Sequence, residues 1–357
     1  MTPLRVALRV DASRDVGVGH VARAIALADE IVSRGGAVQI FGSVTGASWL
    51  LDAIAHRGLT VSPAPDHPTT LRDAVQAAGC TAVILDGYAF DPGTGAALKA
   101  AGLTVLAVQD GPFGAGQTAD LVLDQNLGAT DEFVPPGVPA LLGLEYTLMR
   151  NEVLEARTDQ HPGRDVPKGV IFCGGTDPQA AAPFLTDLVI RTRSAIELTV
   201  VAATDAIAAD LARLLPRLGQ QIDVISPTPQ IVQIAANCDF AVVAAGGSVW
   251  ELLCVGVPAA VVAVADNQEP TIRTIGATGA ALALGTLRDL RSSSAAQDGA
   301  VTMLRRLIDS PRERRDVSAR AGQLIDGRGR ARVIDELSRA VARRSDCTAR
   351  DRPGSEA

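Results

Sequence analysis

Short apolar runs rich in valine, isoleucine and leucine alternate along the chain with longer stretches of helical periodicity. The runs are RVALRV (5–10), AVQIF (37–41), AVILD (82–86), LTVLAV (103–108) and LVLD (121–124), then GVIFC (169–173), ELTVV (197–201), IDVIS (222–226), FAVVAA (240–245) and AAVVAV (259–264). Strands that are buried on both faces and joined by helices form parallel sheets. The pattern therefore predicts an α/β protein with parallel sheets.

A polar segment separates the two series of runs. Residues 150–169, RNEVLEARTDQHPGRDVPKG, are charged and contain two prolines, as is typical of linkers between domains. We therefore expect an N-terminal domain over residues 1–150 and a C-terminal domain over residues 151–342. Residues 343–357 lack apolar periodicity, which predicts a disordered tail.

Composition and charge exclude several classes of partner. The chain has 357 residues, with 33 Lys and Arg against 40 Asp and Glu, so its net charge is −7. This balance does not attract nucleic acid or anionic membranes, and no apolar run is long enough to cross a bilayer. The five cysteines are scattered without the spacing of metal ligands. We expect a cytoplasmic protein with no metal, no nucleic acid partner and no membrane partner, and the pattern does not indicate its oligomeric state.

The first apolar run leads into a glycine-rich turn, DASRDVGVGHVA (11–22), which contains Gly17, Gly19 and His20. The turn matches the dinucleotide pattern G-x-G-x-x-A, but the residues DASRDV separate the strand from Gly17, and the second run ends without the acid that binds a ribose. A nicotinamide site is therefore not expected. His20 begins an amphipathic helix, whose dipole favours a neutral imidazole that can accept a proton. The alternative is a histidine that only caps or packs the turn.

Further motifs accompany this turn. They are LDGYAFD (85–91), VLDQN (122–126), LLGLEYTLMR (141–150), IFCGGTDP (171–178), AAGGSVWELLCVGVPAAVV (244–262) and ADNQ (265–268). In order and spacing, over about residues 5–285, these motifs resemble the PseG/SpsG family, the UDP-sugar hydrolases of pseudaminic acid synthesis. That family is similar in fold to the MurG-type glycosyltransferases.

The resemblance implies a GT-B fold, in which two Rossmann-like domains with parallel sheets face an interdomain cleft. It implies that His20 activates a water molecule and that Tyr88 and Asn267 belong to the catalytic site. Glu251, one turn into a helix, would accept hydrogen bonds from ribose hydroxyls. The residues implied to contact the substrate or nucleotide are Gly17, Gly19, Asp86, Gly174, Gly175, Asp177, Gly246, Gly247, Ser248, Glu251 and Gln268.

The implied activity is hydrolysis of a UDP-linked amino or deoxy sugar at its anomeric carbon, without a metal or cofactor. Two alternatives stay open. One is a GT-B glycosyltransferase that moves the sugar to a small-molecule acceptor, and the other is a nucleotide-sugar binding protein without chemistry. Two departures from the family leave the sugar undetermined: Asp110 precedes Gly111 where paired acids are usual, and the helix after His20 reads VARAIAL, without the usual Met and Cys.

Overall fold

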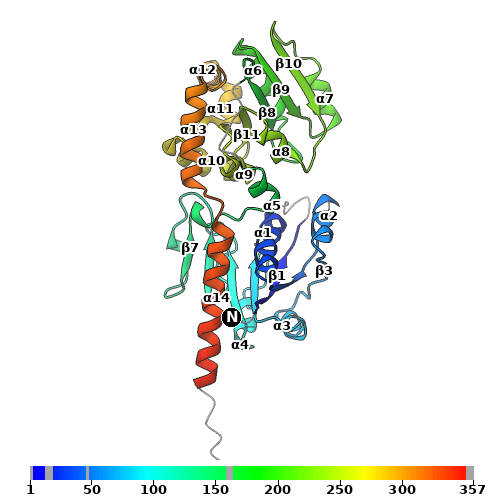
Figure 1. The fold of residues 1–357 in the computed structure, drawn as a ribbon, viewed down its shortest axis with the longest axis vertical. Coiled ribbons are helices and arrows are strands. Elements are labelled where there is room, and N and C mark those ends of the chain that lie inside the picture. The colour runs from blue at the N-terminus through cyan, green and yellow to red at the C-terminus, as the bar shows by residue number, and fades with distance from the viewer. Residues whose placement is uncertain (1–2, 13–18, 46–47, 158–163, 351–357) are drawn as a thin grey trace, which may run out of the picture. The chain divides into compact units, whose positions relative to one another are not determined.

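The computed structural model describes residues 3–12, 19–45, 48–157 and 164–350, which form two α/β units (Figure 1). The first unit combines Met1–Asn151 with Gly327–Ala357, and the second comprises Glu152–Asp326. Each unit contains one parallel sheet, with helices between most of its successive strands. The expectation of two Rossmann-like units with parallel sheets is confirmed.

The sheet of the first unit has seven strands in the order β3-β2-β1-β4-β5-β6-β7, and every pair is parallel. The strands are β1 (Arg5–Val10), β2 (Ala37–Phe41), β3 (Val61–Ser62), β4 (Ala82–Asp86), β5 (Thr104–Val108), β6 (Leu121–Asp124) and β7 (Ala140–Leu142). The helices are α1 (Gly19–Ser33), α2 (Ser48–His56), α3 (Pro68–Ala77) and α4 (Thr94–Ala100), with short 3-10 helices η1 (Asp131–Phe133) and η2 (Leu144–Tyr146). Helix α5 (Asn151–Glu155) begins at the last residue of this part of the chain.

The sheet of the second unit has six parallel strands in the order β10-β9-β8-β11-β12-β13. The strands are β8 (Lys168–Phe172), β9 (Ile196–Val201), β10 (Gln220–Ile225), β11 (Phe240–Ala244), β12 (Ala259–Ala263) and β13 (Leu282–Thr286). The helices are α6 (Ala181–Arg191), α7 (Asp205–Leu211), α8 (Ile231–Ala236), α9 (Ser248–Val255), η3 (Asp266–Gln268), α10 (Glu269–Thr278), α11 (Leu287–Ser292), α12 (Ser294–Asp309) and α13 (Pro311–Leu324).

The strand order reverses near the middle of each sheet. In the first unit β1 pairs with β2 on one side and β4 on the other, and in the second unit β8 pairs with β9 and β11. Ligands of open α/β sheets bind outside the carboxyl ends of the strands at such switch points. His20 and Tyr88 follow β1 and β4, and Gly174 and Gly246 follow β8 and β11. These four residues therefore follow the strands that flank the two switch points.

Helix α1 is held against its sheet by an aliphatic face. Val21, Ala24, Ile25, Ala28 and Ile31 are all buried, and they belong to one core cluster with residues of β1 and β4. Burial of one Val or Ile side chain is worth about 1.5–3 kcal/mol. This packing fixes the first turn of α1 beside the carboxyl end of the sheet.

The helix that follows the second unit returns to the first unit. In α14 (Gly329–Arg350), Val333, Ile334 and Leu337 are fully buried in the core cluster that also contains α1. Gly329 lies so close to the chain at Thr147 that an added Cβ would stand 2.2 Å from the Thr147 carbonyl oxygen. The assignment of all of residues 151–342 to one domain is therefore wrong from Gly327 onward, because the periodicity of a helix does not reveal which sheet it covers.

The C-terminal helix also changes the expectation of a tail over residues 343–357. Helix α14 continues to Arg350, so the first part of this segment is helical, and residues 351–357 lie outside the described part of the chain. Among the described residues, no helix combines the length and apolarity needed to span a bilayer.

Candidate active site

His20 is the second residue of α1 and only 3% of its surface is exposed. Its Nδ1 lies 2.6 Å from Oδ1 of Asp86, the last residue of β4, which is also buried. Because β1 and β4 are paired, the start of α1 lies beside the end of β4. The structure thus brings together two residues that the sequence had assigned to the site.

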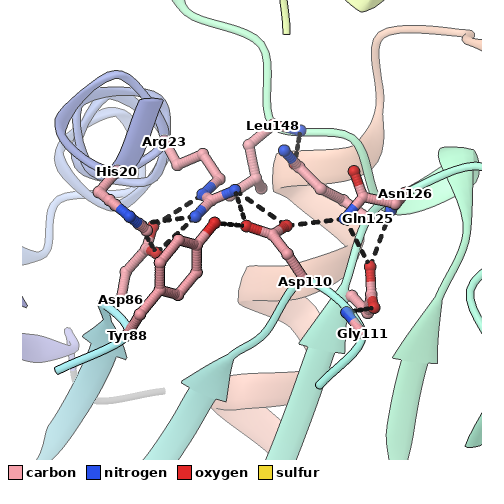
Figure 2. Close-up of polar contacts among 10 residues, drawn as sticks. His20, Arg23, Asp86, Tyr88, Asp110, Gly111, Gln125, Asn126 and Leu148 are labelled. Carbon is pink, nitrogen blue, oxygen red and sulfur yellow. Dashed lines mark hydrogen bonds and ion pairs between the residues drawn. The ribbon is translucent and has the colours of Figure 1, made fainter. Parts of the chain in front are cut away.

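Arg23, one turn further along α1, lies beside both Asp86 and His20. Its Nη2 lies 2.7 Å from Oδ1 of Asp86 and 2.8 Å from Nδ1 of His20 (Figure 2). A guanidinium can only donate and an ionised carboxylate can only accept, so Asp86 accepts from both neighbours, and its 2.6 Å contact with Nδ1 requires that His20 carry its proton there. The other ring nitrogen, Nε2, then has the free lone pair that a general base requires.

The charge state of Asp86 follows from the same contacts. Burial raises the pKa of this carboxyl, but the positive charge of Arg23 and the hydrogen bond from His20 outweigh burial, so the pKa lies below its ordinary value. Burial alone would lower the pKa of Arg23, but the negative charges of Asp86 and Asp110 raise it well above its ordinary value. Asp86 is therefore an anion, and Arg23 a cation, at neutral pH.

A second carboxylate, Asp110, lies on the other side of Arg23. Arg23 Nη1 is 3.2 Å from both oxygens of Asp110. The hydroxyl of Tyr88 and Nδ2 of Asn126 also donate to this carboxylate, the latter at 2.7 Å. Burial and the negative charge of Asp110 raise the pKa of Tyr88, so Tyr88 is a neutral phenol whose proton points to Asp110.

Asn126 is held in place by the end of β6. Its backbone N–H and Nδ2 donate to Oδ1 of Asp124 at 3.0 and 2.9 Å, and Gly111 N donates to Oδ2 of Asp124 at 2.8 Å. The turn after β5 is closed by reciprocal backbone hydrogen bonds between Asp110 and Phe113 of 2.9 and 3.2 Å. The end of β6 and the turn after β5 therefore fix Asp110 from two directions.

Aromatic side chains form the exposed side of this cluster. The Tyr88 ring meets His20 edge-on, with centroids 4.5 Å apart, and the ring of Phe113 lies 5.6 Å from Tyr88. Tyr88 and Phe113 are 48% and 59% exposed. The buried His20 is thus bordered by the exposed ring of Tyr88, which in turn packs against the exposed ring of Phe113.

In the second unit, the turn after β8 contains Gly174, Gly175 and Asp177. Gly174 has φ +86°, and in the described part of the chain no atom lies within 4 Å of the position of an added Cβ at Gly174 or Gly175. Asp177 is 4% exposed, and its two oxygens accept hydrogen bonds from the backbone N–H groups of Ala181 and Ala182 at 2.8 and 2.9 Å. The carboxylate of Asp177 therefore caps the start of α6, and its contact with the substrate stays a prediction.

The turn after β11 leads into α9 through Gly246, Gly247 and Ser248. No acceptor for the backbone N–H groups of Gly247 and Ser248 is found among the described residues, and Gly247 has open space around it. Gln268 in η3 accepts a hydrogen bond from Val264 N at 2.9 Å, and its Nε2 lies 3.7 Å from the position of an added Cβ on Gly246. The α9 N-terminus thus presents free donors beside a fixed amide.

The other residues named from the sequence have separate positions. Gly19 is the first residue of α1, and no atom of the described residues lies within 4 Å of the position of an added Cβ there. Glu251 lies in the first turn of α9. Asn267 lies in η3, and Gly17 and the side chain of Asn267 lie outside the described part of the structure.

Arg23 and Asn126 belong to the cluster although the sequence patterns do not assign them to the site, and Asp110, which the sequence marks only as a departure from a family pattern, belongs to it as well. A signal for Arg23 existed, because a residue three positions after His20 lies on the same face of a helix. Asn126 stands in VLDQN, a motif that had been noted. Within the described residues, no group of three or more His, Cys, Asp or Glu side chains is arranged to hold a metal ion.

Comparison with known proteins gives one similar curated sequence and many similar folds. No family model matches the chain. The chain is 25% identical over 198 residues to the spore coat polysaccharide biosynthesis protein SpsG of Bacillus subtilis, a match that spans 54% of this chain and 56% of SpsG.

Solved structures match over nearly the whole chain. MurG of Acinetobacter baumannii has a TM-score of 0.68 at 15% identity, with 94% of this chain and all of MurG (100%) covered. MnaA of S. aureus, solved with UDP, has a TM-score of 0.63 at 12% identity, with 94% and 96% covered. The chain therefore has the GT-B fold of such structures and, over about half of its length, is similar in sequence to SpsG.

Proposed function

We propose that this chain hydrolyses a nucleotide-diphosphate sugar at the anomeric carbon, with His20 as the general base. The observation that carries the proposal is the buried pair of His20 and Asp86, 2.6 Å apart, at the switch point of the first sheet. Its geometry leaves Nε2 of His20 able to accept a proton. Asp86 stays ionised and stabilises the imidazolium that forms.

In the proposed step, a water oxygen forms a bond to the anomeric carbon while the bond from that carbon to the diphosphate oxygen breaks. The proton of the water passes to Nε2 of His20, and the nucleoside diphosphate leaves with the electron pair. Backbone N–H groups at Gly247 and Ser248, with the positive end of the α9 dipole, suit the charge of the leaving group. The step uses neither a metal nor a cofactor.

We propose UDP as the nucleotide. SpsG is named for polysaccharide biosynthesis, and the MnaA structure contains UDP, which supports a nucleotide-sugar ligand. In this proposal Glu251 accepts hydrogen bonds from the ribose, and Gly174, Gly175, Gly246, Asn267 and Gln268 contact the phosphates or the sugar. Tyr88 would contact the sugar with its ring and its hydroxyl oxygen.

A glycosyltransferase is an equally supported alternative. MurG, whose fold this chain shares, represents that class, and the same histidine can deprotonate an acceptor hydroxyl in place of water. A nucleotide-sugar binding protein without turnover is the third possibility. The chemistry of the His20–Asp86 pair suits both enzymes.

The test is to incubate the full chain with a panel of UDP-sugars without any acceptor, and to measure released UDP and free sugar. We expect release by the wild type and a loss of about two to four orders of magnitude in the rate for His20→Ala. Release that requires an added acceptor would establish transfer instead. UDP-sugar binding without turnover would establish a binding protein, and near-normal turnover by His20→Ala would exclude His20 as the base.

A further inference from the structure

Arg23 contacts two carboxylates with all three of its guanidinium nitrogens. Nε and Nη2 donate to Asp86 at 2.9 and 2.7 Å, and Nη1 donates to Asp110 at 3.2 Å (Figure 2). The Arg23 side chain is only 12% exposed. Each carboxylate in turn holds one residue of the proposed site, since His20 donates to Asp86 and Tyr88 donates to Asp110.

We propose that Arg23 is a positioning residue that clamps Asp86 and Asp110 and thereby fixes the positions of the His20 and Tyr88 side chains relative to each other. The inference rests on the proposed function only in that His20 is there the general base and Tyr88 is assigned to the sugar. Arg23 itself acts through the carboxylates and touches no reacting atom. Nothing in the sequence patterns had assigned it this role.

The clamp is necessary because the buried carboxylate of Asp86 and the partly buried carboxylate of Asp110 repel each other unless a cation stands between them. Without Arg23, Asp86 would lower its electrostatic energy by taking up a proton. A protonated Asp86 becomes a hydrogen-bond donor, and it no longer selects the tautomer of His20 that carries its proton on Nδ1. The base nitrogen would then lose its fixed protonation state.

The positions of Asp86 and Asp110 depend on Arg23 to different degrees. Among the described residues, the side-chain donors to Asp86 are His20 and Arg23. Asp110 has an additional donor in Asn126, which Asp124 holds in place. Removal of Arg23 should therefore disturb His20 more than Tyr88.

Lysine cannot reproduce the clamp. A guanidinium is a planar fork that reaches two oxygens of one carboxylate and a second carboxylate at once, whereas an ammonium is a point charge on a flexible stem. Arg23→Lys therefore separates the effect of the fork from the effect of the charge. Arg23→Met removes both.

The experiment records NMR spectra of the imidazole nitrogens and their protons in the full chain at neutral pH, with His20→Gln to assign the signal of His20. We expect the wild type to show the tautomer protonated on Nδ1. Arg23→Met and Arg23→Lys should lose this single tautomer. A wild type protonated on Nε2, or an Arg23→Met spectrum like that of the wild type, would overturn the proposal.

Arg57→Met is the matched control. Arg57 donates to both carboxylate oxygens of Asp29, a residue of α1, at 2.6 and 3.1 Å. The Arg57 side chain is 16% exposed, which is close to the value for Arg23. This variant loses a comparable ion pair and should keep the His20 signal. Loss of the signal in Arg57→Met as well would mean that any destabilisation of α1 disturbs His20, which contradicts a specific clamp.

Arg23→Lys also covers the case in which Arg23→Met fails to fold, because it retains the charge. A His20 signal that is unchanged in Arg23→Lys would show that charge alone suffices and would overturn the clamp. On any UDP-sugar that the wild type turns over, Arg23→Lys should lower kcat about a hundredfold with little change in KM. A wild type without turnover would contradict the proposed function while leaving the NMR result on Arg23 intact.

Discussion

Replacing Asp86 by asparagine tests both the chemistry and the energetics of the buried pair. The carboxylate accepts three hydrogen bonds, from Nδ1 of His20 at 2.6 Å and from Nη2 and Nε of Arg23 at 2.7 and 2.9 Å. The amide of the Asp86→Asn variant would present one oxygen and one NH₂ group, so at least one donor would face another donor. Breaking a buried ion pair costs about 3–5 kcal/mol, and the lower end applies because Asp110 still pairs with Arg23.

The effect on rate should be larger than the effect on stability. An amide in place of the Asp86 carboxylate cannot hold His20 in the tautomer with the proton on Nδ1, and loss of the orienting carboxylate in a Ser-His-Asp triad lowers kcat by about 10⁴-fold. We expect a loss approaching that size in the UDP-release assay. Urea unfolding of the same variant measures the loss in the free energy of unfolding.

Asp29→Asn is the control for the Asp86 variant. Asp29 is a buried carboxylate on α1 that accepts from Arg57 at 2.6 and 3.1 Å and from Asn151 N at 3.1 Å. Its replacement should reduce stability by a similar amount and leave kcat nearly unchanged. Equal losses of kcat in the two variants would refute the assignment of Asp86 to His20.

The stability effect of Asp86 should also depend on pH in a defined direction. The pKa of Asp86 is lowered from its ordinary value of 3.8, so its contribution is fully present above that pH and is lost as the pH falls through the value in the folded state. The difference in the free energy of unfolding between wild type and Asp86→Asn should therefore shrink in acid. A difference that is constant down to acid pH would contradict the ionised state assigned to Asp86.

Three further predictions concern other parts of the chain. The pKa of Tyr88 is raised above its ordinary value of 10.0 by burial and the Asp110 charge, so at pH 10.0 the wild type should show no more tyrosinate absorbance than Tyr88→Phe, whereas Asp110→Asn should bring the titration of Tyr88 to lower pH. Glu251→Ala should weaken the binding of UDP by about 1–3 kcal/mol, because a charge-assisted acceptor for the ribose is lost, and unchanged affinity by calorimetry would place the ribose elsewhere. Gly329→Ala should lower the thermal midpoint, since the new Cβ would stand 2.2 Å from the Thr147 carbonyl oxygen; an unchanged midpoint would show that this close approach is absent.

The strands of both sheets could be predicted from the sequence to the extent that both of their faces are buried. All ten apolar runs lie in strands. Nine of them are inner strands, which are covered on both faces in a parallel sheet, and the tenth, IDVIS, is the edge strand β10. Strands β3, β7 and β13 were missed. They lie at or toward the sheet edges, β3 and β7 have only 2 and 3 residues, and β13 contains Gly285, so their apolar signal is short or interrupted.

Part of the candidate site was also visible in the sequence. Asp86 ends a buried run and His20 and Tyr88 follow such runs, and residues at the carboxyl ends of neighbouring parallel strands gather at one edge of a sheet. Their roles came from the resemblance of the motifs to a family, since a histidine that begins a helix has other uses. The role of Asp177 as a cap of α6 was not visible, because the same GGTDP pattern suits a ligand turn and a helix start.

The sequence by itself thus determined the class of fold and the segments that carry the site, because apolar periodicity and glycine-rich turns are local properties. Tertiary structure alone decided that α14 covers the first sheet and that Arg23 joins Asp86 to Asp110. These contacts link residues 63 and 87 positions apart in the sequence. In the sequence, the whole second unit separates α14 from the other members of its core cluster. Such contacts depend on which strands pair and which faces meet, and a charged residue on a helix has the same sequence pattern whether its partner is a buried carboxylate or water.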